Sequence, residues 1–157
     1  MTIHQTALAV AACLCSLAGQ ASANTVEVDL AAVQSCGIEK GSSAILCITE
    51  ALQPCEAVIP ETPAVAALCY QKRRAAFEAD LPAALDAVAA QEGETTGSEA
   101  RIVVKYEMLT RALLCDRDME LMALSGSKEA EITRAQHRCM ALVTGDVWLR
   151  LRMTTAP

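Results

Sequence analysis

The sequence predicts an all-α fold, a small helical bundle of disulfide-stapled antiparallel hairpins. Apolar residues recur at three- and four-residue spacing, and the two-residue alternation typical of half-buried strands is absent over any useful length. Of the eight cysteines, all but Cys13 and Cys15 form consecutive pairs that each bracket a turn signal. An even set of cysteines in an exported chain is typical of a disulfide framework.

Residues 1–23 have the features of a secretory signal peptide. They contain no Lys, Arg, Asp or Glu, and a small-apolar run ends just before Ala21-Ser22-Ala23, a typical signal peptidase site. We therefore expect residues 24–157 to form a single helical domain, periplasmic or secreted. A competing interpretation is that Val10-Ala11-Ala12-Cys13 acts as a lipobox and makes Cys13 a lipid anchor, but the apolar run before it is very short. No apolar stretch is long enough to span a membrane.

Charge and composition restrict the kinds of partner. The 157-residue chain has a net charge of −6, which disfavours nucleic acid as a partner and favours cationic ones. A domain of this length buries about two-thirds of the surface that its unfolded chain exposes. Aromatic residues are few, so the core must consist mostly of Ala, Leu, Val, Ile and Met. The aromatic residues are Tyr70, Phe77, Tyr106 and Trp148.

The cysteine spacing favours one of the 15 possible disulfide connectivities. Residues equidistant from the turn of an antiparallel helical hairpin face each other, and each consecutive cysteine pair is centred on a turn: at Gly41, at Thr62 between two prolines, and at Ser127. A fully nested arrangement remains the alternative. Metal or redox chemistry is disfavoured because no C-x-x-C motif occurs. The favoured pairing is Cys36–Cys47, Cys55–Cys69 and Cys115–Cys139.

The last of these disulfides makes a geometric demand. Disulfide-bonded Cα atoms lie about 4.4–6.8 Å apart, whereas packed helix axes are usually about 8–10 Å apart. Small residues near the bridge, such as Ala112, Ala135 and Ala141, would allow the closer approach. Closing a loop of this length should stabilise the fold by roughly 3–4 kcal/mol.

The helices follow from the pattern between the turns. Residues 24–35 have no clear preference, and residues 44–52 predict a short helix. Residues 64–93 are rich in helix formers, with Pro82 either kinking the helix or following a new cap at Asp80. The face predicted to be buried consists of Ala66, Tyr70, Phe77, Leu81, Leu85 and Val88.

The second half predicts a long hairpin. Residues 91–99 are predicted to form an acidic loop, and a long helix follows, with Ile102, Tyr106, Leu109 and Leu113 expected to face inward. Ser125 or Ser127 is expected to cap the last helix. The buried face of that helix is predicted to hold Ile132, Ala135, Cys139, Leu142 and Leu149.

Candidate functional residues are few. His137 is the only histidine after the signal peptide and has no partner at catalytic or ligand spacing, and nucleophile elbows, phosphate loops and H-E-x-x-H are missing. We therefore expect no enzyme activity, no metal and no cofactor. A copper(I) site of Met119, Met122 and Met140 is the alternative to their filling the core. The candidate partner-binding residues are the loop acids Glu92, Glu94 and Glu99.

The second half also resembles the LprI-like lysozyme-inhibitor family of exported bacterial proteins. Arg111 stands four positions before Cys115, Thr144 stands five after Cys139, and Leu151-Arg152 closes the helix, as in that family. Cys36 and Cys47 have about the spacing of the family's first cysteine pair. The chain departs from the pattern at Ala112, where the family has Asp, and in having Cys55 and Cys69.

The resemblance implies an inhibitor of lysozyme-type muramidases that acts by binding. An acidic inhibitor would be attracted to such cationic enzymes. The alternative function is a non-catalytic structural or assembly module of the periplasm, for which Trp148, Leu151 and Met153 would form an exposed interface patch.

Overall fold

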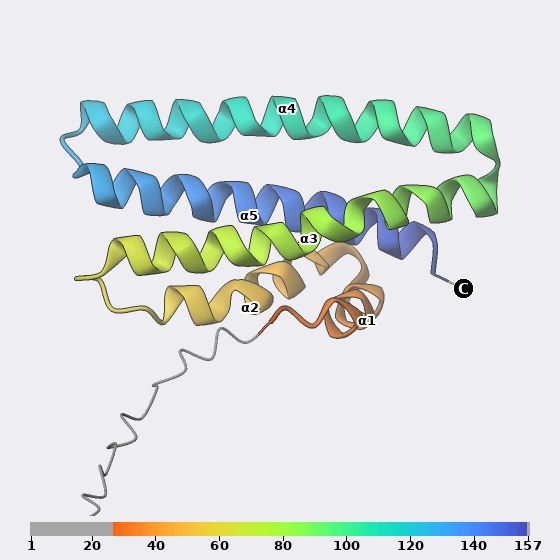
Figure 1. Ribbon diagram of the computed structural model, residues 1–157, viewed down its shortest axis with the longest axis horizontal. Coiled ribbons are helices and arrows are strands. Elements are labelled where there is room, and N and C mark those ends of the chain that lie inside the picture. Colours follow the sequence, from red (N-terminus) through yellow and green to blue (C-terminus); the bar gives the residue numbers. More distant parts are fainter. Residues whose placement is uncertain (1–26, 157) are drawn as a thin grey trace, which may run out of the picture.

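A computed structural model describes residues 27–156, which form five α-helices and no strand (Figure 1). The predicted all-α class is therefore confirmed. The predicted signal peptide, its cleavage site and Cys13 lie outside the described residues. Between residues 27 and 156, no helix is long and apolar enough to cross a membrane.

The first two helices form a short hairpin. Helix α1 (Leu30–Lys40) begins after Asp29, whose side chain accepts a hydrogen bond from the backbone N–H of Ala32 at 3.0 Å. Gly41, with a φ of 52°, ends α1, and a 3-10 turn over Gly41–Ser43 leads into α2 (Ile45–Glu56). Residues 24–35 show no clear preference in their sequence pattern, yet α1 begins there because Asp29 supplies its cap.

Helix α3 (Pro63–Glu92) has 30 residues and begins with a proline, which needs no hydrogen-bonding partner in the first turn. It continues through Pro82, so the interpretation that Asp80 caps a separate helix is wrong. The predicted inner face is largely confirmed: Ala66, Tyr70 and Phe77 are fully buried.

The last two helices form the long hairpin. Helix α4 (Glu94–Leu124) and helix α5 (Glu129–Thr154) are joined by a turn in which Gly126 has a φ of 84°. The prediction that Ser125 or Ser127 caps α5 is wrong. Ser125 ends α4 and donates its hydroxyl to the carbonyl of Met122 at 2.8 Å, while the N-cap of α5 is Lys128.

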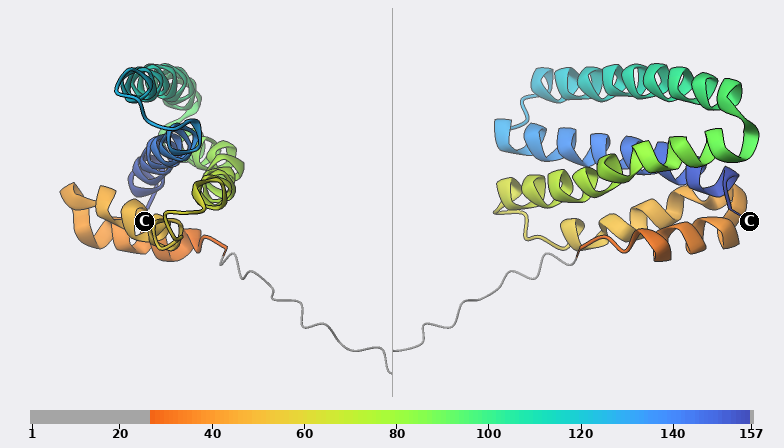
Figure 2. Two further views of the ribbon diagram at one scale, coloured as in Figure 1. Left: turned by 90° about the vertical axis from the view of Figure 1, so that its left-hand side faces the viewer. Right: turned by 45° about the vertical axis from the view of Figure 1, so that its right-hand side comes forward.

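The three long helices lie side by side, with α5 between α3 and α4 over much of their length (Figures 1 and 2). Helix α2 packs on α3 and α5, and α1 packs on α2 and α5, on the side away from α4. As a result α4 lies at the edge of the molecule, and it packs against α5 and, at its first turns, against α3.

The core forms where α1, α2, α3 and α5 meet. Trp148 is 1% exposed, and its ring centroid lies 5.3 Å from that of Phe77. The helices approach closely at Gly145: a Cβ there would lie 2.7 Å from Ile48 Cγ2 and 3.1 Å from Phe77 Cε2. The largest buried side chains are those of Trp148, Tyr70, Phe77, Ile48, Leu52 and Leu149.

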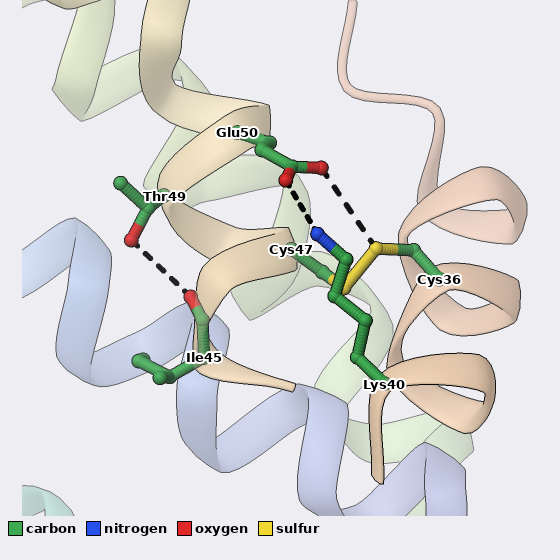
Figure 3. Close-up of a disulfide and its surroundings, with 6 residues drawn as sticks. All are labelled: Cys36, Lys40, Ile45, Cys47, Thr49 and Glu50. Atoms are coloured by element: carbon green, nitrogen blue, oxygen red, sulfur yellow. Dashed lines mark hydrogen bonds and ion pairs between the residues drawn. A yellow bond between two sulfur atoms is a disulfide. The ribbon is translucent and has the colours of Figure 1, made fainter. Parts of the chain in front are cut away.

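The favoured disulfide pairing is confirmed and the nested arrangement is wrong. The Cα–Cα distances are 5.9 Å for Cys36–Cys47, 5.4 Å for Cys55–Cys69 and 5.9 Å for Cys115–Cys139. At the first bridge, an ion pair of 2.5 Å between Lys40 and Glu50 adds a second link from α1 to α2 (Figure 3). Such a set of disulfides is typical of a protein that folds in an oxidising compartment.

Candidate interaction surfaces

The predicted acidic loop is a tight corner between two helices, so the loop prediction for residues 91–99 is wrong. Gly93, with a φ of 94°, is the one residue between the end of α3 at Glu92 and the start of α4 at Glu94. Four residues on, Gly97 is buried against α3: a Cβ there would lie 2.4 Å from Ala89 Cβ and 2.8 Å from Ala89 Cα. The backbones of α3 and α4 are therefore in close contact at Gly97.

The acids predicted to bind a partner lie around this acidic corner, which we define as Glu92, Glu94 and Glu99. All three side chains are exposed, and none of them forms an ion pair with another residue of the described region. A carboxylate in the first turn of a helix, as at Glu94, is favoured by the helix dipole. At the C-terminal end of α3 the helix dipole disfavours a carboxylate, so helix stability does not explain the presence of a glutamate at position 92.

A second surface lies on the edge helix, where the predicted inner face is wrong. Ile102, Tyr106, Leu109 and Leu113 do not face inward: their exposed fractions lie between 53% and 68%. The side of α4 that faces α5 carries a different set of residues, which are buried or half-buried: Val104, Glu107, Met108, Arg111, Ala112, Cys115, Met119 and Met122. Helix α4 thus carries large apolar side chains on both sides, together with Glu107 and Arg111 on the packed one, and within the described region only one side packs against another helix.

An ion-pair network joins α4 to α5 and includes a residue of the family resemblance. Arg111 Nη1 lies 2.6 Å from Asp146 Oδ2, which is also 3.4 Å from Arg150 Nη2. Glu107 completes the network by pairing with both arginines. Thr144, another residue of the resemblance, is buried and donates its hydroxyl to the carbonyl of Met140 at 2.8 Å. These contacts give both residues structural roles within the hairpin.

An open groove of about 330 Å³ runs between the first half of α4 and the end of α5. Its lining is mainly apolar and includes Val103, Val104 and Val147, together with the charged Glu99 and Arg150. The groove therefore adjoins the acidic corner at Glu99 and includes one exposed apolar residue of α4, Val103.

The expected interface patch at the end of α5 is wrong, because Trp148 belongs to the core. Its indole Nε1 donates to Asp80 Oδ2 at 2.7 Å, and Arg152 Nη2 lies 2.5 Å from the same oxygen. Leu151 and Met153 are half-buried. Asp80 thus holds α5 onto α3, a role that sequence spacing did not reveal because the partners are about 70 positions apart.

A cluster at the other end of the bundle makes stability depend on pH. Burial of Glu56 favours its neutral form. Ion pairs with Arg138 and with Arg134, whose Nη2 lies 3.6 Å from Glu56 Oε2, outweigh burial and lower the pKa of Glu56 below 4.5. The neighbouring Tyr70 hydroxyl is buried and has no hydrogen bond of normal geometry to any described residue. Burial first, and then the Glu56 carboxylate, raise the pKa of Tyr70 to about 12.

Replacing Glu56 by glutamine tests this cluster. Because the folded-state pKa is depressed, the carboxylate stabilises the fold above pH 4.5 and loses this effect as the pH falls through the folded-state value. We expect Glu56→Gln to cost up to about 1 kcal/mol at pH 7 and nearly nothing at pH 3, measured by urea unfolding at each pH. The control Glu61→Gln, at an exposed acid without an ion pair in the described region, should be neutral at both. A cost for Glu56→Gln that does not change with pH would contradict the assignment.

No protein-family model, curated protein or solved structure matches the chain. Among the described residues, no group of three or more His, Cys, Asp or Glu side chains is arranged to hold a metal ion. The most distinctive surface features of the described region are the exposed acidic corner, the exposed apolar face of α4 and the groove beside them.

Proposed function

We propose that this chain is an exported, disulfide-stabilised protein that acts by binding another protein rather than by catalysis. The observation that carries the proposal is the line of large apolar side chains on α4, at Ile102, Tyr106, Leu109 and Leu113, exposed opposite the side that packs on α5. Contiguous apolar surface of this kind marks interaction sites in folded proteins. The disulfides support export, because they persist in oxidising compartments such as the periplasm or the extracellular space.

The partner that we propose is a lysozyme-type muramidase, as the resemblance to the LprI-like family implies. The acidic corner supports this choice, since Glu92, Glu94 and Glu99 are exposed, unpaired within the described region and held on a rigid turn. Many lysozymes are cationic, and opposite charge accelerates and directs association. The groove that begins at Glu99 offers apolar contact beside these charges.

A lysozyme inhibition assay with matched variants tests this proposal. The oxidised protein should slow cell-wall lysis by at least one of the c-type, g-type and i-type lysozymes. Replacing Glu92, Glu94 and Glu99 together by glutamine should weaken inhibition at least about tenfold, because three favourable charges are lost. The control replaces Glu39, Glu61 and Glu129 by glutamine. These acids are likewise exposed and without ion pairs in the described region, and they lie in the last turn of α1, in a loop and in the first turn of α5, respectively.

The two triple variants carry the same net charge, so a general electrostatic effect would weaken both equally. Equal inhibition by the wild type and by the corner variant would exclude the acidic corner as the binding site. An absence of inhibition with all three lysozyme types would exclude muramidase inhibition.

A second candidate function is a structural or assembly module of the cell envelope. It is favoured by the exposed face of α4 rather than by the residues expected from the sequence, since Trp148 is buried. A stable envelope complex that is lost when α4 is altered at Leu113, and kept when the acidic corner is neutralised, would support this function over inhibition.

A further inference from the structure

We propose that the outer face of α4 binds the same face of a second copy of this chain, with the two α4 helices antiparallel. The outer face is defined here as Ile102, Val103, Tyr106, Leu109, Leu113 and Leu114, whose exposed fractions lie between 48% and 68%. Helix α4 forms one edge of the molecule, and no other described helix lies beyond it (Figures 1 and 2). A second helix can therefore approach along its length.

The exposed area is close to what such a pairing needs. These six side chains expose on the order of 700 Å² in each copy, and a standard protein interface buries about 800 Å² per partner. Neighbouring parts of each hairpin would add to this area at the margins. A 31-residue helix is about 46 Å long, so the whole face can be covered by one helix of equal length.

Four of the six outer-face residues are spaced symmetrically along the helix. Ile102 and Leu114 lie six positions on either side of Met108, and Val103 and Leu113 lie five positions on either side. A two-fold axis at the level of Met108 would therefore place Ile102 opposite Leu114 of the second copy, and Leu114 opposite Ile102. An isologous interface requires this reciprocity, because every contact between two residues occurs twice, once on each side of the two-fold axis.

Charges at the ends of the face favour the antiparallel orientation. Glu99 stands three positions before Ile102, and Arg117 stands three positions after Leu114. The spacing of 3, 4 and 7 residues between Glu99, Ile102, Tyr106, Leu113 and Arg117 puts them on one side of the helix. In the antiparallel pair, Glu99 of each copy meets Arg117 of the other, whereas a parallel pair would set Glu99 against Glu99.

The existing contacts of these charges do not oppose the pairing. Glu99 has no ion-pair partner within the described region, and Arg117 contacts only the adjacent Asp118 at 3.1 Å, with 64% of the Arg117 side chain exposed. An exposed pair between neighbouring residues is weak. Glu92 and Glu94 lie outside the apolar stretch, but Glu99 belongs both to the acidic corner and to this pairing, so a muramidase and a second copy would compete for Glu99.

Sedimentation equilibrium of the oxidised full chain, without any lysozyme present, tests the pairing. We expect the wild type to have twice the mass of one chain at micromolar concentrations. Leu113→Glu places one carboxylate in each half of the apolar interface and should raise the dissociation constant at least about tenfold. The control Leu68→Glu makes the same change at a leucine of α3 that is 57% exposed, and it should leave the dissociation constant unchanged.

A charge exchange tests the antiparallel orientation. Arg117→Glu should raise the dissociation constant about three- to tenfold, because the new carboxylate of each copy then faces Glu99 of the other. Adding Glu99→Arg to Arg117→Glu should restore it to within about twofold of the wild type, since each pair is again of opposite charge. Circular dichroism of every variant establishes that the helices remain folded.

Three results would overturn the proposal. A wild type that stays monomeric throughout the concentration range would show that no second copy covers the face, which would then be open to another protein. A dimer that survives Leu113→Glu would place the contact on a different surface. A failure of Glu99→Arg to rescue Arg117→Glu would exclude the antiparallel pairing.

Discussion

Replacing Trp148 by alanine is expected to lower the free energy of unfolding by about 3–5 kcal/mol, the range for removing a large buried aromatic side chain. Trp148 is 1% exposed and packs on Phe77, so its removal leaves a cavity where α5 meets α3. The change also removes the indole N–H that donates to Asp80 at 2.7 Å, which leaves Arg152 as the remaining partner of that carboxylate within the described region.

Urea unfolding followed by circular dichroism measures this effect, because Trp148 is the only tryptophan and its loss removes the fluorescence signal. Trp148→Phe keeps most of the ring packing and should cost clearly less than alanine. Leu68→Ala, at an exposed leucine, should change the free energy by no more than about 0.5 kcal/mol. A cost below about 1.5 kcal/mol for Trp148→Ala would contradict the placement of this side chain in the core.

Removing the disulfide between α4 and α5 is expected to have the second largest effect. Replacing Cys115 and Cys139 together by alanine should lower the free energy of unfolding by about 3–4 kcal/mol, because the bond closes a loop with a sequence separation of 24. The bond links α4 to α5, which lies beside it along most of its length.

The matched comparison is the removal of the Cys36–Cys47 bond, which closes a shorter loop with a separation of 11 and should cost somewhat less, about 3 kcal/mol. Hydrogen exchange adds a spatial readout. Without the Cys115–Cys139 bond, the amides at the far end of α4 should exchange faster, while those of α3 should change little. A loss of stability below about 1 kcal/mol would mean that the ion-pair network already fixes the hairpin.

The disulfide pairing was predictable from the sequence because it is a local property. Each pair is centred on a turn, and the positions of the turns follow from Gly41, the prolines around Thr62, and Gly126. Antiparallel helices then bring equidistant residues together whatever the rest of the fold does. The small residues expected near the last bridge are consistent with this, since Ala141 is fully buried and the Cα–Cα distance is 5.9 Å.

The buried face of α4 was not predictable by the same means. Apolar periodicity tells which residues share a face, and α4 has two such faces, one through Tyr106 and Leu113 and one through Val104 and Met108. The charged residues Glu107 and Arg111 lie on the second face and give it the composition of a solvent-facing side. They are accommodated there because acidic and basic residues of α5 pair with them.

Partners distant in sequence account for the other differences. Trp148 is buried because Asp80 on α3 accepts its N–H, and Arg73, one of three consecutive basic residues, is 7% exposed and donates to the carbonyl of Ala51 on α2. The acidic stretch has the composition of a loop, but one glycine suffices for the turn because Gly97 lets α4 pack directly on Ala89.

Titration calorimetry of the oxidised protein against c-type, g-type and i-type lysozymes tests the proposed function most directly. We expect binding of at least one type with a dissociation constant of about 1 μM or tighter, weakened by added salt because the acidic corner supplies charge complementarity. The same titration with reduced, alkylated protein should show no binding. An absence of binding to all three lysozymes by protein with its disulfides intact would contradict the proposal that this chain is a muramidase inhibitor.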